Sequence, residues 1–226
     1  MTGHEDGEPP SVPEGAGDSP VEDTTSADAQ PTMPERFRQS LVYTVADAMG
    51  GEFQHEVGTW LHHNRDRLKR ARVGTHGVDL TRRAAWLIED VDACHAPFAS
   101  ALRGRVLEEL GAACKHFDVE PFDVEPFPMQ ATMYHHHGFY AWHRDRYEDT
   151  VTAQRRMAWL YYLHAEPRRF MGGELEFLDG RLVDPQTDTL VIFPAEQLHR
   201  VRAVECYTAG VEDARWTING WLETAP

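Results

Sequence analysis

The C-terminal half of the chain is a series of short strand-like segments separated by turn residues. From Pro126 onward, segments rich in Val, Ile, Tyr, Phe and Trp alternate with Gly, Asp and Pro, which is typical of antiparallel strands. Seven segments fit: MQATMYHH, FYAWHRD, RRMAWLYYLHA, GELEFLDGRLV, DTLVIFP, HRVRAV and RWTINGWLE. Asp179-Gly180 predicts a hairpin turn inside the fourth. This pattern predicts a β-sandwich or jelly roll.

Helical periodicity precedes these strands. After a short predicted strand in SLVYTVADAM, apolar residues recur at near-helical spacing in GEFQHEVGTWLHHNRDRLKRA and in FASALRGRVLEELGAACKHF. The expected faces are Phe53, Val57, Trp60, Leu61 and Leu68 in the first, and Phe98, Leu102, Val106, Leu107 and Leu110 in the second. We therefore expect an α+β, mainly β domain at 34–226, with helical support at about 50–117 and a jelly-roll core at about 127–222.

The N-terminal segment has a different composition. Residues 1–33 are rich in Pro, Gly, Ser, Thr and acidic residues, and such a segment buries too little apolar surface to fold, so we predict a disordered acidic tail. The net charge is −15, but residues 1–35 hold nine acidic residues and no Lys or Arg, which leaves 28 acidic and 22 basic residues elsewhere. This balance makes nucleic acid and anionic membranes unexpected partners, although it does not exclude a local basic groove.

Cysteine usage and hydropathy indicate the compartment. The three cysteines, Cys94, Cys114 and Cys206, form no CxxC pair, which argues against a disulfide framework and a zinc knuckle. The N-terminus has no secretory signal pattern, and no apolar run is long enough to span a bilayer. We expect a cytoplasmic protein, and the sequence gives no oligomeric state.

Two histidines and a carboxylate form a candidate metal site. On a strand, His143 and Asp145 project to the same side and Arg144 to the other, because residues two apart share a face. His199 begins a later predicted strand, and Arg215 and Thr217 share a face on the last one. Two imidazoles and one carboxylate suit non-haem Fe(II), and an arginine beside them suits a dicarboxylate held by a bidentate pair.

In this order the residues resemble the Fe(II)- and 2-oxoglutarate-dependent oxygenases, specifically the prolyl-4-hydroxylase-like branch, over roughly Leu41 to Leu222. The resemblance implies a double-stranded β-helix (a cupin-like jelly roll) backed by N-terminal helices. It also implies that His143, Asp145 and His199 bind iron and that Arg215 pairs with the far carboxylate of 2-oxoglutarate.

Further matches add to the cosubstrate site. Tyr134 lies where the family often has Y-x-x-G-x-x-Y-x-x-H-x-D, and Tyr162 matches a tyrosine that touches the same carboxylate. Thr217 is assigned to this site with them, and MGGELEF matches a Gly-Gly-x-Leu turn. Two features depart from the family pattern. Arg215 follows His199 by sixteen positions rather than about ten, with a turn-rich loop expected in ECYTAGVEDA, and the glycine in YHHHGFY is shifted by one.

The resemblance implies a 2-oxoglutarate-dependent dioxygenase. Such an enzyme uses O₂, with ascorbate as a supporting reductant, to hydroxylate an unactivated C–H bond and releases succinate and CO₂. The substrate would be a peptidyl residue, with proline one candidate, or an amino-acid-like small molecule. The alternatives are a 2-oxoglutarate- or oxygen-sensing module acting through a partner, and a plain metal-binding cupin, which Arg215 and Thr217 disfavour.

Two polar segments near the motif have no single assigned role. Consecutive strand residues alternate sides, so His135, His136 and His137 cannot all face one ion, and we assign them a rim or substrate-contact role, or none. The polar run YEDTVTAQRR is predicted to be a loop that could close over substrate.

Overall fold

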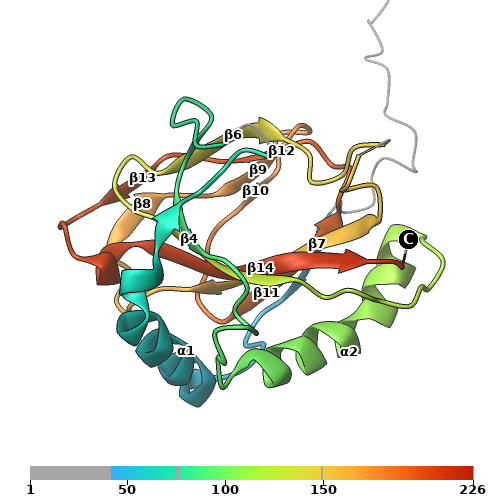
Figure 1. Ribbon diagram of the computed structural model, residues 1–226, viewed down its shortest axis with the longest axis horizontal. Coiled ribbons are helices and arrows are strands. Elements are labelled where there is room, and N and C mark those ends of the chain that lie inside the picture. The colour runs from blue at the N-terminus through green and yellow to red at the C-terminus, as the bar shows by residue number, and fades with distance from the viewer. Residues whose placement is uncertain (1–41, 75–76, 149, 226) are drawn as a thin grey trace, which may run out of the picture. The chain divides into compact units, whose positions relative to one another are not determined.

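The computed structural model describes residues 42–74, 77–148 and 150–225. These residues form two antiparallel sheets that face each other, with two helices on the outer face of the larger sheet (Figure 1). In spatial order the larger sheet contains β1 (Tyr43–Val45), β11 (Thr189–Pro194), β7 (Arg155–Leu163), β14 (Arg215–Glu223), β5 (Met129–Tyr134), β4 (Trp86–Ile88) and β2 (Lys69–Arg70). The acidic tail predicted for residues 1–33 lies outside the described residues.

The smaller sheet covers the inner face of the larger one. Its order is β10 (Leu182–Val183), β9 (Leu175–Phe177), β12 (His199–Val201), β6 (Phe139–His143) and β3 (Arg83–Ala84), and β13 (Val204–Cys206) pairs with β8 (Phe170–Gly172) in a separate ribbon. The two sheets do not close into a barrel. The prediction of a mainly β jelly roll with helical support is confirmed.

Alternation along the central strands separates two apolar layers. On β7, Trp159 and Tyr161 face the helices, whereas Ala158 and Tyr162 lie in the layer between the sheets. On β14, Trp216 and Ile218 likewise join the helical layer. Residues two apart share a face, so the polar residues of β14 at alternate positions are directed between the sheets.

The helices α1 (Gly51–His63) and α2 (Ala99–Phe117) cover the outer face (Figure 1). Their contact centres on aromatic rings: Phe53 packs edge-on against both Phe98 and Tyr161, at centroid distances of 6.1 and 5.5 Å. Edge-to-face pairs of this kind add to the burial of apolar surface. The helices thereby support the sheet whose other face points toward the smaller sheet.

Both helices differ from prediction in detail. The first ends at His63, since the Asn64 side chain donates to the Trp60 carbonyl and residues 65–67 form the 3-10 turn η2 (Arg65–Arg67). Leu68, predicted on the helical face, therefore lies outside the helix. The second has the predicted extent, but Leu107 is exposed, and the buried stripe runs through Ala99, Leu102, Val106, Ala113 and Cys114.

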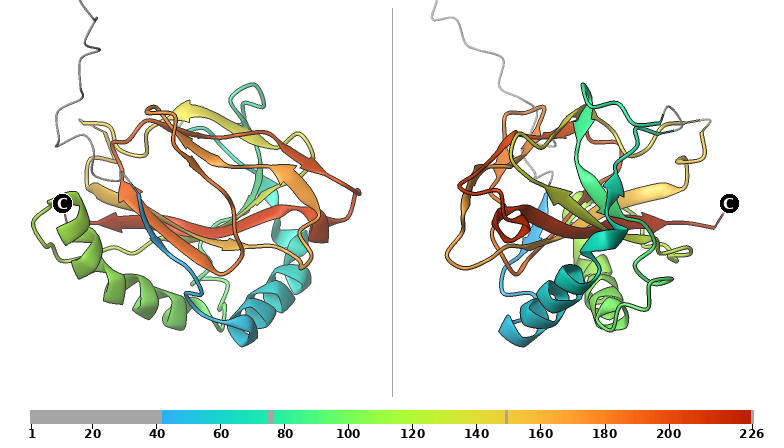
Figure 2. Two further views of the ribbon diagram at one scale, coloured as in Figure 1. Left: turned by 180° about the vertical axis from the view of Figure 1, so that it is seen from behind. Right: turned by 60° about the vertical axis from the view of Figure 1, so that its left-hand side comes forward.

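The segment from β2 to β4 carries strands that the sequence did not predict. It starts in the larger sheet with β2, enters the smaller sheet as β3, which pairs with β6, and returns to the larger sheet as β4 (Figure 2). It thereby joins one edge of each sheet. The hairpin at Asp179-Gly180 is confirmed by the pairing of β9 with β10.

Two further features concern membrane-spanning helices and cysteines. No helix in the described part of the chain is long and apolar enough to cross a membrane. Cys94, Cys114 and Cys206 are all free thiols.

Candidate functional site

A cavity of about 1550 Å³ opens between the two sheets. Its larger-sheet wall contains Tyr134, Arg215, Thr217, Asn219 and Trp221, and its smaller-sheet wall contains Tyr140, His143, Leu175, His199 and Val201. Asp145 also lines it. This volume exceeds the usual range of about 300–1,000 Å³ for a pocket that holds one small ligand.

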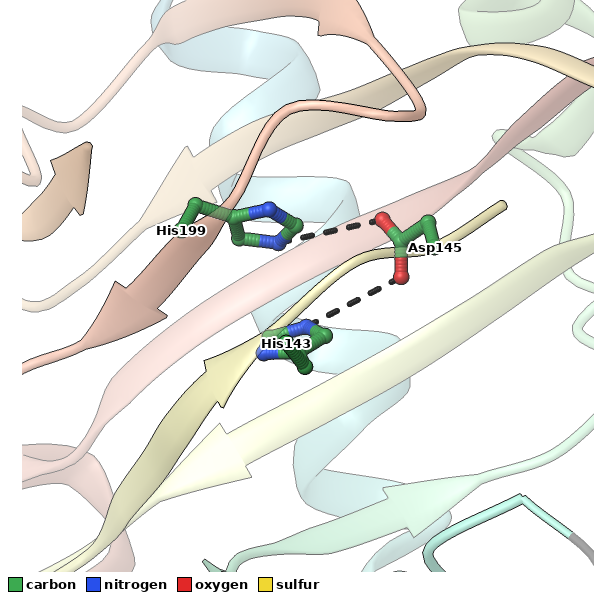
Figure 3. A group of neighbouring side chains, drawn as sticks. All are labelled: His143, Asp145 and His199. Atoms are coloured by element: carbon green, nitrogen blue, oxygen red, sulfur yellow. Dashed lines mark ion pairs between the residues drawn. The ribbon is translucent and has the colours of Figure 1, made fainter. Parts of the chain in front are cut away.

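Two histidines and an aspartate converge in this cavity (Figure 3). His143 is the last residue of β6 and His199 the first of β12, and the two are paired opposite each other in the sheet. The Nε2 atoms of His143 and His199 each lie 3.8 Å from an oxygen of Asp145, one on Oδ1 and the other on Oδ2. One ligand atom from each residue lies within 4.8 Å of the others, so a single ion between them is within reach of all three.

The predicted reason for this convergence was wrong in one respect. Asp145 does not share a strand face with His143, because β6 ends at His143. The chain turns there, and the backbone amides of Asp145 and Arg146 both donate to the Ala195 carbonyl at 3.0 Å. Ala195 directly follows β11, so the larger sheet positions the carboxylate.

Backbone carbonyls define the proton positions on both imidazoles. The Nδ1 atom of His143 lies 2.9 Å from the Ala141 carbonyl oxygen, and that of His199 lies 2.9 Å from the Gln197 carbonyl oxygen. A carbonyl only accepts, so each Nδ1 carries the proton and donates it. Each Nε2 lone pair is then free and directed toward Asp145, the arrangement usual in histidines that bind metal.

Burial and charge favour the metal-binding protonation states of His143 and Asp145. Burial, and next to it the neighbouring His199, lowers the pKa of His143 to about 3. Burial alone would raise the pKa of Asp145, but His199, His143, Arg155 and a hydrogen bond from Trp221 outweigh it and hold that pKa below its ordinary value. A neutral His143 and an ionised Asp145, together with His199, form a donor set that fits non-haem Fe(II) and leaves further coordination positions open.

Tyr140 lies against the cluster because of a β-bulge. The pairing of β12 with β6 shifts between His199↔His143 and Val201↔Tyr140, so β6 holds one extra residue. The extra residue turns Tyr140 to the side of His143, and their rings stack at 3.5 Å between centroids. Burial raises the pKa of Tyr140 to about 12. Sequence spacing alone would have placed the two on opposite faces.

Arg215 is a buried cation on the opposite wall, 1% exposed. Its Nε donates to the Gly173 carbonyl at 2.7 Å and its Nη2 to the Tyr162 hydroxyl at 3.3 Å. Its Nη1 is buried without a protein partner. Gly173 has φ +76°, and a Cβ there would lie 2.7 Å from Arg215 Cδ, so this glycine of MGGELEF makes room for the arginine. A buried guanidinium with a free donor beside a cavity fits a carboxylate ligand.

The other predicted cosubstrate residues surround Arg215. Tyr134 lines the cavity, with the Arg215 Cζ atom 5.0 Å from its ring centroid. Thr217 also lines it, but its hydroxyl donates to Asn219 Oδ1 at 3.2 Å. Tyr162 is fully buried and does not line the cavity, but its hydroxyl accepts from Arg215 Nη2.

Several polar residues near the motifs lie elsewhere. His135 contacts the Gly210 carbonyl and His136 accepts from the Cys206 amide, so these histidines join the chain after β12 and do not line the cavity. Arg200 and Arg202 pair with carboxylates of β9 and its approach. The long connection before Arg215 contains β13 and the 3-10 turn η3 (Val211–Asp213), so its prediction as a turn-rich loop was incomplete.

Residues that sequence reasoning missed include Trp221. This residue alternates with Arg215, Thr217 and Asn219 on β14, so strand parity could have found it. Its indole hydrogen-bonds Asp145, and the Arg155 guanidinium lies 3.5 Å above its ring. Arg155 also donates to the Asp145 carbonyl, so both residues position the carboxylate.

Comparison with known proteins gives a family model that matches part of the chain, and a fold. Residues 129–223 match the sequence model of the 2OG-Fe(II) oxygenase superfamily. An uncharacterized PKHD-type hydroxylase of Synechocystis sp. is 29% identical over 140 residues, which are 56% of this chain and 46% of that relative. The match thus spans about half the length of the relative.

Solved structures agree with the fold. A Pseudomonas putida prolyl-4-hydroxylase superposes with a TM-score of 0.60 and 20% identity, covering 82% of this chain and 93% of its own. A Trichoplax adhaerens prolyl hydroxylase, solved with a peptide fragment of the hypoxia inducible factor oxygen degradation domain, gives 0.62 and 15% identity, covering 80% and 83%. At such identities the likeness establishes the fold.

Proposed function

We propose that this chain, which carries a domain of the 2OG-Fe(II) oxygenase superfamily, is a 2-oxoglutarate-dependent hydroxylase. It would oxidise an unactivated C–H bond of a peptidyl residue, with proline one candidate, or of an amino-acid-like small molecule. His143, Asp145 and His199 would hold Fe(II). Arg215 would bind the distal carboxylate of 2-oxoglutarate, with Tyr134, Tyr162 and Thr217 around it.

One observation carries this proposal. A preorganised two-histidine, one-carboxylate cluster shares a cavity with a buried arginine whose Nη1 has no protein partner. Metal binding alone would not require the buried arginine with its unpaired donor. Leaving such a donor unpaired is unfavourable, and a ligand carboxylate would satisfy it.

The chemistry of the bound iron and its cosubstrate accounts for the reaction. When bound by His143, Asp145 and His199, iron together with 2-oxoglutarate and O₂ would supply the oxidant for hydroxylation of a C–H bond, with succinate and CO₂ as the other products. The residues of the chain bind, orient and exclude water. Phe193 packs edge-on against the His199 ring at 4.8 Å and Phe177 lies behind it, so His199 can rotate little. Such fixed geometry is the protein's contribution to a metal site.

The similar proteins support a hydroxylase, and one structural neighbour was solved with a peptide. The cavity volume also accommodates a cosubstrate together with a second ligand. The assignment to a peptide or a small molecule, the cytoplasmic location and the role of the acidic tail stay predictions.

The direct test is turnover without a prime substrate. Purified protein supplied with Fe(II), ascorbate, air and 2-oxoglutarate should slowly form succinate, measured by mass spectrometry. A sensor that only binds 2-oxoglutarate, the alternative function, would bind it without forming succinate. No succinate above that formed by an Asp145→Ala variant would contradict the proposal. Screening peptides and metabolites for a gain of one oxygen would then identify the substrate.

A further inference from the structure

Besides Arg155 and Arg215, four arginines of the described part of the chain line the cavity. Arg72, Arg82 and Arg83 come from the segment between β2 and β4, and Arg144 comes from the turn after β6. We call these four the arginine rim. Arg72, Arg82 and Arg144 are exposed and Arg83 is half-buried, in contrast to Arg215. The rim therefore lies toward the solvent side of the cavity.

The charge of the rim is not neutralised by the other residues that line the cavity. Among the described residues of its lining, the carboxylates are Glu89, Asp145 and Glu223. Asp145 belongs to the metal cluster and Glu223 pairs with Arg155 at 3.1 Å, so only the exposed Glu89 is left to oppose four cations. Outside the lining, the Asp79 carboxylate, which accepts from the backbone amide and hydroxyl of Thr81, interacts with Arg82 and offsets part of its charge. A basic cluster of this size stands out in a chain with net charge −15.

Arg83 brings this charge close to the metal cluster. Its Cζ lies 4.6 Å from the Tyr140 ring centroid, and that ring stacks 3.5 Å from the His143 ring. The guanidinium is therefore separated from a metal-cluster imidazole by no more than the sum of these two distances. Its Nη1 donates to the Arg72 carbonyl at 3.2 Å, whereas its buried Nε has no partner. Arg83, like Arg215, therefore has a hydrogen-bond donor without a protein partner close to the metal cluster.

We propose that the arginine rim recognises a carboxylate on the prime substrate, close to the carbon that is hydroxylated. This inference rests on the proposed function. In the proposed function, Arg215 binds the distal carboxylate of 2-oxoglutarate at the buried end of the cavity. The rim would therefore bind a different ligand. The same chemistry has two sources: an Asp or Glu side chain of a peptide next to the modified residue, or the free carboxylate of an amino acid.

Two matched pairs of probes separate these sources. The first pair is a capped, fluorescently labelled pentapeptide with Asp beside a central proline and its counterpart with Asn. The second pair is free L-proline and L-prolinamide, used as competitors. Binding is measured with the protein loaded with Fe(II) and 2-oxoglutarate under nitrogen. The acidic member of one pair should bind about tenfold more tightly than the amide, as two partly exposed charge pairs would provide.

Variants link this preference to the rim. Arg82→Gln/Arg144→Gln should reduce the preference to about twofold or less, since the exposed charge pairs that supply most of it are then lost. Arg83→Lys, which keeps the charge, should retain part of it. Arg70→Gln is the matched control, because Arg70 comes from β2 but lies over Trp86 and does not line the cavity. Raising NaCl from about 0.05 M to about 0.5 M should weaken the preference by shortening the Debye length.

The outcomes are distinguishable from failure of the proposed function. If wild-type protein forms succinate but neither acidic probe is preferred over its amide, the rim does not read a carboxylate. If the double variant keeps the full preference for the acidic probe, the rim does not recognise the carboxylate. If wild-type protein forms no succinate at all, the proposed function fails and this inference falls with it. Preference within the peptide pair alone would assign the carboxylate to a peptide side chain.

Discussion

The buried end of the cavity and its rim place charge in contrasting surroundings. At the buried end, His143, His199 and Arg215 are 7%, 3% and 1% exposed, and each donates to a backbone carbonyl. At the rim, Arg72, Arg82 and Arg144 are exposed and lie in turns and loops outside the strands. Groups held by a rigid backbone are oriented before a ligand arrives, which catalysis needs. Exposed arginines instead adapt to a ligand, and substitutions there should cost less.

Breaking the buried cluster should have the largest effect. His143→Ala, Asp145→Ala and His199→Ala should each abolish formation of succinate and strongly reduce the iron content, because two remaining ligands no longer hold the ion. Metal analysis of purified protein and mass spectrometry of succinate measure both. His135→Ala and His137→Ala are controls outside the cavity and should keep their iron. Normal turnover in two of the three ligand variants would show that the metal assignment is wrong.

Replacement of Arg215 should have the second-largest effect. A buried charge pair broken on one side costs about 3 to 5 kcal/mol, so Arg215→Ala should raise the apparent constant for 2-oxoglutarate by roughly two to three decades. Iron content should not change. Arg215→Lys should be intermediate, because lysine keeps the charge but loses the planar fork. Arg202→Ala is the control, since Arg202 pairs with Glu174 and Glu176 outside the cavity. If Arg202→Ala impaired cosubstrate binding and Arg215→Ala did not, the role given to Arg215 would be refuted.

Trp221 tests whether partners of the ligands matter at the buried end. Trp221→Phe removes the indole donor to Asp145 but keeps a ring beneath Arg155. Loss of such a partner typically weakens metal affinity by about tenfold or more. Competition with a fluorescent chelator measures it. Trp142→Phe is matched, because Trp142 packs under Arg200 and does not line the cavity. Equal affinities in the two variants would contradict a positioning role.

A pair of glycines separates backbone strain from the fit of Arg215. Gly173 and Gly180 both have positive φ, +76° and +83°, so replacement by Ala should destabilise either position by about 1 to 3 kcal/mol. Only a Cβ at Gly173 would meet Arg215, whereas nothing lies within 4 Å at Gly180. Gly173→Ala alone should therefore raise the constant for 2-oxoglutarate, by about fivefold for a loss of about 1 kcal/mol. Thermal denaturation and cosubstrate titration distinguish the two effects.

The smallest effect is expected from removing the N-terminal segment. Deleting residues 1–33 should leave iron binding and succinate formation unchanged, because their composition predicts no contribution to a folded core. Metal analysis and the turnover assay measure this directly. A truncated protein that is insoluble or unfolded would refute the expectation. Loss of action on an identified substrate, with uncoupled turnover intact, would assign the tail a docking role.

The sequence by itself determined which residues share a face of a strand. The alternation in RWTINGWLE placed Arg215 and Thr217 on one side and Trp216 and Ile218 on the other, and β14 spans that same segment. The helix at 99–117 and the hairpin at Asp179-Gly180 could likewise be predicted from the sequence. Each of these depends on residues only a few positions apart, so local spacing and turn chemistry suffice.

Only the tertiary structure decided where the strands end and which of them meet. His199 lies opposite His143 through the pairing of β12 with β6, and Asp145 reaches both because its amide is bound to the carbonyl of Ala195. The bulge that turns Tyr140 toward His143 exists only in that pairing. Arg83 likewise reaches the cavity because β3 pairs with β6. Backbone hydrogen bonds between distant segments fix all of these positions. Because every non-proline residue has the same backbone donor and acceptor, no local sequence pattern encodes which strands pair.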